Sequence, residues 1–320
     1  ELAIYIGYEL VSDLNKIYFS ATPLRVKIEP GAVVSRSQYM GVDSCSPYAV
    51  KITSAIVYDT GTIMYPATEE FELLLDLYAP DVDLSGKSVP SMVIIHGGGF
   101  KGGTRTKEEL VDYAERFAAQ GYLAISIDYR VSGQVPELNP QFASLYNQLV
   151  TTEVEEEAQQ ALGMFSAMED SLKAMAWLEN HAEGQGFEIS ALGLLGSSAG
   201  GITSLNVGYG LNDYGFAVPE FKVVVNHWGN LLIDQESGKP SITADEAALI
   251  SVHGTEDPTV LYSGSVEIHA RADEIGLTNE LITSKGAGHG FSVNRLWDSE
   301  SFEGSGYTKG ERILNFVNAA

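Results

Sequence analysis

From residue 51 onward, short apolar runs alternate with stretches of helical periodicity. Residues 71–78 place apolar side chains at every second position, as one face of a half-buried strand requires. Residues 92–95 are wholly apolar, which is typical of a strand covered on both faces. The apolar positions of residues 107–119 repeat at helical spacing, and Gly121 ends this predicted helix.

The same alternation continues to the carboxyl end of the chain. Further strands are predicted at residues 51–58, 122–127, 189–195, 221–225, 248–252 and 280–283. Further helices are predicted at residues 166–181 and 311–318, and another begins near residue 202. Strands that alternate with helices predict an α/β fold with a mostly parallel central sheet and helices on both faces, here over residues 51–320.

The first 50 residues lack this clear pattern. Residues 17–20 and 24–28 are strand-like, prolines separate them, and we expect residues 1–50 to form an N-terminal extension packed on the main domain. The chain begins at Glu1 rather than Met, which indicates a processed or trimmed chain. Any signal peptide for secretion or the periplasm would therefore lie outside this sequence.

Residues 131–164 interrupt the alternation after the predicted strand that leads into Asp128. A segment of this length inside a compact domain is typical of a lid or a binding insertion. Its acidic run, residues 153–157, predicts a solvated helix face.

A glycine-serine motif follows the predicted strand at residues 189–195. Gly196-x-Ser198-x-Gly200 is the pattern of a sharp strand-to-helix turn, which strains the central residue and projects its hydroxyl into a cleft. Ser197 does not fit the centre of such a motif, because its flanking positions are Leu195 and Ala199. The pentapeptide alone is weak evidence, since glycine and serine are also ordinary turn residues.

A serine nucleophile needs a base, and histidine is suited to accept and return its proton. Of the six histidines, His289 is the favoured base because it lies in a glycine-rich loop after the last predicted strand. The other five have different expected roles: His181 and His269 as surface residues, His96 and His253 as structural hydrogen-bonding groups, and His227 as a lining residue of the pocket.

The base in turn needs a carboxylate that fixes its tautomer. Asp257 follows the predicted strand 248–252, and Pro258 fixes the turn after it, so we favour it over its neighbour Glu256. The alternative is that Asp257 is only a solvated turn acid. The chain order Ser198, Asp257, His289 is the order expected for a hydrolase with this turn.

The run His96-Gly97-Gly98-Gly99-Phe100 directly follows the predicted strand 92–95. Glycines let backbone N–H groups face a ligand, and donors held there would meet the oxyanion of a tetrahedral intermediate together with the N–H of Ala199. A phosphate cradle is the competing interpretation. The spacing matches neither the P-loop pattern nor the dinucleotide-binding pattern, which favours an oxyanion.

Composition narrows the classes of partner. The chain has 19 basic and 43 acidic residues and a net charge of −24, which argues against nucleic acid and anionic lipid as partners. No run approaches the roughly 20 apolar residues of a membrane-spanning helix, so we expect a soluble protein. Cys45 is the single cysteine, which excludes an intramolecular disulfide and a cysteine-rich metal site.

Five motifs in this order resemble the landmarks of the α/β-hydrolase carboxylesterases with an HGGG motif: His96–Phe100, Asp128–Arg130, Gly196–Gly201, His253–Val260 and Gly286–Phe291. Within that fold, the chain is similar to the hormone-sensitive-lipase-like esterases and to the related bacterial branch that includes feruloyl esterases. The resemblance implies an α/β-hydrolase fold and a catalytic triad of Ser198, His289 and Asp257. It also implies an oxyanion hole from Gly98, Gly99 and Ala199. Ser197 departs from the pattern, because the hormone-sensitive-lipase-like enzymes usually have Asp or Thr there.

These features predict a serine carboxylesterase that cleaves small-molecule esters of small or medium acyl groups through an acyl-enzyme, without a metal or organic cofactor. One alternative is a feruloyl or acetylxylan esterase that acts on plant-polymer esters. The candidate pocket residues for an aromatic acid are Phe100, Phe142, Tyr146 and Trp228. An alternative from another class is a catalytically dead hydrolase that serves as a binding module.

Overall fold

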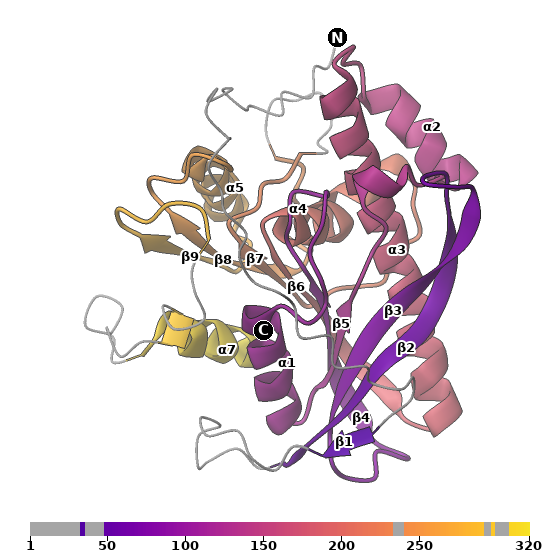
Figure 1. Cartoon of the computed structure of the whole chain (residues 1–320). Helices are drawn as coiled ribbons and strands as arrows, with labels where there is room; N and C mark the ends of the chain where they lie inside the picture. Colours follow the sequence, from indigo (N-terminus) through magenta and orange to yellow (C-terminus); the bar gives the residue numbers. More distant parts are fainter. Residues whose placement is uncertain (1–32, 36–47, 233–239, 291–295, 298–306) are drawn as a thin grey trace, which may run out of the picture.

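A sheet of nine strands forms the centre of the described structure (Figure 1). The structure is a computed structural model that describes residues 33–35, 48–232, 240–290, 296–297 and 307–320. The predicted strands at residues 17–20 and 24–28, and most of the predicted N-terminal extension, lie outside these residues.

The strands run in the spatial order β1-β2-β3-β5-β4-β6-β7-β8-β9. Their bounds are β1 Val33–Ser35, β2 Val50–Ile63, β3 Glu69–Pro80, β4 Ser88–Ile95, β5 Leu123–Ile127, β6 Glu188–Ser197, β7 Val223–His227, β8 Ala248–Gly254 and β9 Asn279–Ser284. The pairs β1–β2, β2–β3 and β3–β5 are antiparallel, and every pair from β5 onward to β9 is parallel. The predicted mostly parallel sheet is confirmed, and the carboxyl ends of its parallel strands share one edge.

Helices cover both faces of this sheet, as predicted (Figure 1). The helices are α1 Glu108–Ala119, α2 Pro140–Leu149, α3 Glu155–Gln185, α4 Ala199–Leu205, α5 Tyr262–Ile275 and α7 Lys309–Ala319. Buried residues of α1 and α7 pack on one face, while those of α3, α4 and α5 pack on the other. Side chains of strand β4 alternate between the two faces of the sheet. Met92 packs in the core with α1 and α7, and Val93 packs in the core with α3, α4 and α5.

The predicted insertion at residues 131–164 contains more helix than its pattern indicated. It holds the 3₁₀ turn η1 (Ser132–Gln134), all of α2 and the beginning of α3. Helix α3 therefore begins at Glu155, eleven residues before its predicted start at Ser166. Glu155, Glu156 and Glu157 form its first turn, where carboxylates interact favourably with the positive end of the helix dipole. The acidic run is thus the start of a helix, and Glu155 and Glu156 are exposed.

Arg130, fully buried after β5, ties this insertion to the sheet. Its guanidinium donates to both Asp170 carboxylate oxygens, at 2.7–3.2 Å, and to Glu169 Oε1 at 3.1 Å. The same group donates to the carbonyl oxygens of Thr62 at the end of β2 and Glu137 in the insertion. Every one of these acceptors lies on a different part of the chain from the arginine, so the cation joins β2, the insertion and α3.

None of the helices in the described ranges is long and apolar enough to cross a lipid bilayer.

Removal of the carboxylate in Asp170→Ala is expected to lower the free energy of unfolding by about 3–5 kcal/mol, because it leaves a buried guanidinium without its main partner. Urea denaturation followed by circular dichroism measures this change. Glu156→Gln is the matched control, since it removes an exposed carboxylate that pairs with Lys101 and should leave the midpoint unchanged. Equal midpoints for the two variants would show that the Arg130 network does not hold the insertion in place.

Candidate active site

Ser198 lies at the turn between β6 and α4, with φ 54° and ψ −119°. Non-glycine residues rarely adopt this part of conformational space, and such strain persists only where the surroundings impose it. The Ser198 N–H donates to the carbonyl oxygen of His227 at 2.8 Å, and the Ser198 carbonyl accepts the N–H of Ile202 at 2.9 Å. These two bonds anchor the turn to β7 on one side and to the first turn of α4 on the other.

The glycines on either side of Ser198 are required by close backbone packing. A Cβ on Gly200 would lie 2.0 Å from the carbonyl oxygen of Ile95, at the end of β4. A Cβ on Gly196 would lie 2.0 Å from the carbonyl oxygen of Gly200. No side chain fits at either position, which explains the spacing of glycines that the sequence shows.

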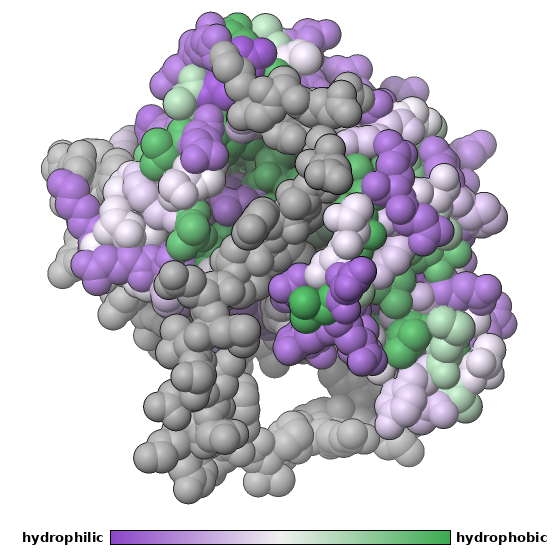
Figure 2. Space-filling model, turned by 90° about the horizontal axis from the view of Figure 1, so that it is seen from above, coloured by the Kyte–Doolittle hydropathy of each residue, from purple (hydrophilic) through white to green (hydrophobic). Residues whose placement is uncertain are grey.

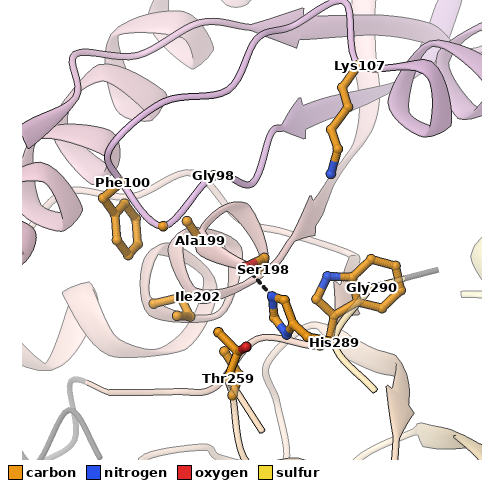
Figure 3. A pocket seen from close by; sticks show the side chains of 12 residues that line it. Gly98, Phe100, Lys107, Ser198, Ala199, Ile202, Thr259, His289 and Gly290 are labelled. Atoms are coloured by element: carbon orange, nitrogen blue, oxygen red, sulfur yellow. Dashed lines mark hydrogen bonds between the residues drawn. The ribbon is translucent and has the colours of Figure 1, made fainter. Parts of the chain in front are cut away.

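Three loops at the carboxyl edge of the sheet bring Ser198, His289 and Asp257 together. Ser198 Oγ lies 2.8 Å from His289 Nε2, and His289 Nδ1 lies 2.7 Å from Asp257 Oδ2 (Figure 3 shows the first of these contacts). Because a carboxylate only accepts, Nδ1 of His289 carries a proton, and Nε2 of the neutral ring can accept the Ser198 hydroxyl proton. The side chain of His289 is 23 % exposed, while that of Asp257 is fully buried.

Asp257 is held as a carboxylate by hydrogen bonds. Burial acts to raise its pKa, but hydrogen bonds from His253, from His289 and from the N–H groups of Val260 and Thr259 outweigh burial and hold the pKa well below its usual range. The two backbone bonds reach Oδ1 at 2.8 and 2.9 Å. Asp257 is therefore negatively charged at neutral pH, whereas its neighbour Glu256 is exposed, and the hydrogen bond from His289 Nδ1 is accepted by Asp257.

The glycine-rich loop after β4 packs directly on the serine turn. A Cβ on Gly97 would lie 2.6 Å from the Ser197 carbonyl oxygen, so this residue approaches the backbone beside Ser198. Gly98 and Gly99 have φ values of 128° and 61° and line the same cavity as Ala199. As the first residue of α4, Ala199 has an N–H that the helix itself does not bond.

A cavity of about 360 Å³ opens over Ser198 at the carboxyl edge of the sheet. Seen from this side, the surface is hollowed near its middle, with hydrophobic residues in the hollow (Figure 2). Its lining consists of Gly98, Gly99, Phe100, Lys107, Ser198, Ala199, Ile202, Trp228, Thr259, Val260, His289 and Gly290 (Figure 3). Phe100, Ser198 and Trp228 in this lining all have positive φ. Strained backbone thus concentrates at the cavity, as it does at many functional sites.

Two of the four predicted pocket residues, Phe100 and Trp228, line this cavity. Phe142 instead packs on Phe216, with ring centroids 4.5 Å apart, and is almost fully buried. The Tyr146 hydroxyl donates to the Ala158 carbonyl oxygen at 3.1 Å. Both side chains belong to α2 and pack against Phe216 and α3 rather than over Ser198.

Two histidines differ from their predicted positions. His227 does not line the cavity but is fully buried beside Trp228 and Tyr113, and its ring nitrogens have no hydrogen-bond partner. Burial lowers the pKa of His227 to about 3, so the ring is neutral. His269 is buried rather than at the surface, and its Nδ1 lies 2.6 Å from Asn279 Oδ1. The burial of both residues depends on how helices and strands pack together, which sequence periodicity does not predict.

His96 is a structural residue, as predicted. Its Nδ1 lies 2.8 Å from the Gly97 carbonyl oxygen, and its ring stacks on Tyr129 with centroids 4.2 Å apart. The Tyr129 hydroxyl donates to the His96 carbonyl oxygen at 3.0 Å. The motif Asp128–Arg130 therefore supports the glycine-rich loop from behind.

Sequence reasoning missed five lining residues: Lys107, Ile202, Thr259, Val260 and Gly290. Four of them lie within four residues of a predicted site residue, which is a signal that could have identified them. Lys107 is different, because it precedes α1 and brings an ammonium group to the cavity, where it forms an ion pair with Glu109. In the part of the chain that the structure describes, no cluster of three or more His, Cys, Asp or Glu side chains is arranged to hold a metal ion.

The chain is similar to one family model over part of its length and to solved esterase structures in fold. The BD-FAE family model matches residues 75–144, which include β4, the glycine-rich loop and α1. The native structure of a thermophilic esterase from Thermogutta terrifontis superposes with a TM-score of 0.56 at 19 % identity, over 83 % of this chain and 90 % of that chain. Its propionate-bound form gives a TM-score of 0.56 over 83 % of this chain and 92 % of that chain, again at 19 % identity. The likeness shows a shared fold.

Two curated relatives are non-reducing polyketide synthases. The non-reducing polyketide synthase atr1 of Stereocaulon alpinum is 31 % identical over 109 residues, which are 32 % of this chain and 4 % of the synthase. The non-reducing polyketide synthase prhL of Penicillium brasilianum is 36 % identical over 75 residues, 23 % of this chain and 3 % of that protein. These matches cover only a small part of the relatives' length.

The two cavity glycines allow a matched test of the loop. Gly98→Ala would place a Cβ 2.0 Å from the Gly102 carbonyl oxygen at φ 128°, so the loop must move and the variant should lose most of its stability or fold wrongly at the site. In Gly99→Ala, the nearest atom to the new Cβ is Gln160 Nε2 at 3.9 Å, so only the cost of a left-handed alanine remains, about 1–2 kcal/mol. Thermal unfolding of both variants measures the difference, and a Gly98→Ala variant as stable as Gly99→Ala would contradict the packing described above.

Proposed function

We propose that this α/β-hydrolase carboxylesterase cleaves esters of small or medium acyl groups through Ser198 as nucleophile, His289 as base and Asp257 as orienting acid. The observation that carries the proposal is the unbroken hydrogen-bonded chain from Ser198 Oγ through His289 to Asp257, at the floor of an open cavity. A serine that is hydrogen-bonded to a base, which is itself oriented by a third group, is the geometry of an activated nucleophile.

The reaction proceeds in two halves. His289 Nε2 accepts the Ser198 hydroxyl proton while Oγ attacks the ester carbonyl carbon, and the resulting oxyanion accepts N–H bonds from Gly98, Gly99 and Ala199. The tetrahedral intermediate collapses, His289 returns the proton to the leaving alcohol, and an acyl-enzyme remains on Ser198. Water then attacks the acyl carbon, again with His289 as the base, and releases the carboxylic acid. Throughout, the Asp257 carboxylate stabilises the imidazolium form of His289.

The size of the cavity supports a small or medium acyl group. A volume of about 360 Å³ lies at the low end of the range found for small-molecule sites. The esterase of Thermogutta terrifontis, which shares the fold, has been solved with propionate and with butyrate bound and in a form phosphorylated by paraoxon. Short acyl esters and organophosphate inhibitors are therefore the first compounds to test.

A feruloyl or acetylxylan esterase is the second candidate function. It is supported by the BD-FAE match over residues 75–144 and by the rings of Phe100 and Trp228 in the cavity lining. Aromatic side chains offer stacking surface to a phenolic acid.

Ser198→Ala is expected to lower kcat for p-nitrophenyl acetate by about 10⁴-fold or more, because the nucleophile is lost. Ser197→Ala is the matched control. Ser197 is the immediate neighbour of Ser198, and the buried hydroxyl of Ser197 has no hydrogen-bond partner in the described structure. Ser197→Ala should therefore keep wild-type activity and stability. Full activity in Ser198→Ala would exclude the proposed mechanism.

The same pair of variants separates an enzyme from a binding module. A fluorophosphonate probe should label wild type and Ser197→Ala with one equivalent and leave Ser198→Ala unlabelled, as measured by intact mass. An unlabelled, inactive wild type would favour the binding module.

Acyl preference is read from kcat/KM on p-nitrophenyl esters of increasing chain length together with methyl ferulate. The 360 Å³ cavity predicts the highest values for acetyl to butyryl groups and a steady fall for longer chains. A kcat/KM for methyl ferulate above that for the acetyl ester would instead select the second candidate function. Both substrates share one catalytic serine, so Ser198→Ala serves as the blank for each.

A further inference from the structure

The carboxylate of Asp257 contacts a second histidine. His253 Nε2 lies 3.1 Å from Asp257 Oδ2, the same oxygen that lies 2.7 Å from His289 Nδ1. His253 is fully buried at the end of β8, four residues before the aspartate. Asp257 is therefore placed between two histidine rings, of which only that of His289 reaches Ser198.

The partners of His253 determine its tautomer. Besides Asp257, Nε2 faces the carbonyl oxygen of Val260 at 2.9 Å, and both groups can only accept. Nε2 therefore carries a proton. On the other side of the ring, Nδ1 lies 2.7 Å from the hydroxyl of Ser265 in α5, which can donate to it. In the neutral ring, Ser265 thus keeps the proton on the nitrogen that faces Asp257.

The four hydrogen bonds to Asp257 are divided evenly between its oxygens. Oδ1 accepts from the N–H groups of Thr259 and Val260, while Oδ2 accepts from His253 and His289. A buried carboxylate with donors on both oxygens cannot rotate without breaking bonds that no water replaces. Loss of the His253 bond would leave Oδ2 with His289 as its single donor and weaken the hold on the orientation of the carboxylate.

We propose that His253 is a positioning residue for catalysis, which holds Asp257 Oδ2 toward His289 and shares its negative charge, with Ser265 fixing the tautomer of His253. The inference rests on the proposed triad. It deepens that function by adding the pair Ser265–His253, which bonds the same carboxylate oxygen as His289. No proton moves through His253 in this role, because its Nε2–H bond persists while His289 takes and returns the proton.

This role predicts a change in basicity as well as in rate. With one donor fewer, the Asp257 carboxylate keeps more of its negative charge for His289 and stabilises the imidazolium more strongly. The acid limb of the kcat/KM profile should then move to higher pH. Among the described residues, the titratable side chains in contact with His253 and Asp257 are His289 from the loop after β9 and Tyr262 from α5, whose ring meets His253 edge-on.

The test compares four variants of the full chain. His253→Leu removes both ring nitrogens, His253→Gln keeps an amide donor, and Ser265→Ala removes the group that fixes the tautomer. Tyr262→Phe is the matched control, because its hydroxyl pairs with Thr283 at 2.7 Å and not with the carboxylate. Active sites are counted with a fluorophosphonate, so kcat refers to folded enzyme only.

We expect His253→Leu to lower kcat per active site by about 10- to 100-fold, as loss of a supporting hydrogen bond behind a functional group commonly does, with KM changed less than about twofold. Its acid limb should shift to higher pH. His253→Gln should recover part of both changes, Ser265→Ala should show them in smaller size, and Tyr262→Phe should match wild type.

Wild-type kcat per active site and an unmoved acid limb in His253→Leu would overturn the proposal. A lower count of active sites with unchanged kcat per site would do the same, since it would assign His253 to folding alone. If His253→Leu does not fold, an unmoved limb in Ser265→Ala overturns it. Failure of the triad itself is distinguishable, because it would appear as activity retained in Ser198→Ala.

Discussion

The backbone conformation of Ser198 depends on glycine backbones packed where side chains would collide. Gly200 faces the Ile95 carbonyl oxygen at the end of β4, and Gly97 of the next loop faces the Ser197 carbonyl oxygen. The serine turn and the glycine-rich loop therefore fix one another through main-chain contacts. Main-chain groups vary less in position than side chains do, so the loop N–H groups and the Ser198 hydroxyl keep a constant relation. The proposed stabilisation of an oxyanion requires such preorganisation.

The parallel sheet supplies the second constraint. Strands β4, β6, β8 and β9 end at one edge, so the loops that follow them meet there although they are far apart in sequence. At this edge the charge of Asp257 is buried, which is favourable only because both oxygens are fully bonded. Arg130, which follows β5, shows the same principle, because carboxylates and carbonyls surround the buried cation.

The sequence predicted what depends on order along the chain, and failed where burial depends on packing between distant segments. Apolar runs located the parallel strands, and residues just after those runs, Ser198, Asp257 and His289, lie together because parallel strands share an edge. His269 carries polar neighbours and gives no signal of the Asn279 side chain that covers it. Phe142 is aromatic and within the insertion, yet Phe216, far along the chain, holds it away from the cavity. The acidic run 153–157 was correctly predicted as a solvated helix face, but it was assigned to the insertion, so the start of α3 was placed eleven residues too late.

The position of His253 shows why a strand-end histidine is informative beyond its own element. A histidine at the end of a buried strand is stabilised when both ring nitrogens form hydrogen bonds, since unbonded polar atoms in the core cost free energy. His227, at the end of β7, meets this condition with neither nitrogen and is kept neutral by burial. His253, near the end of β8, meets it with both, through Ser265 and the Asp257–Val260 turn. His227 pairs in register with Val252, so the rings of His227 and His253 point to opposite faces of the sheet, and the strand alone does not select the contact with Asp257. The contact arises because the turn after β8 brings the Asp257 side chain back to His253, near the end of that strand.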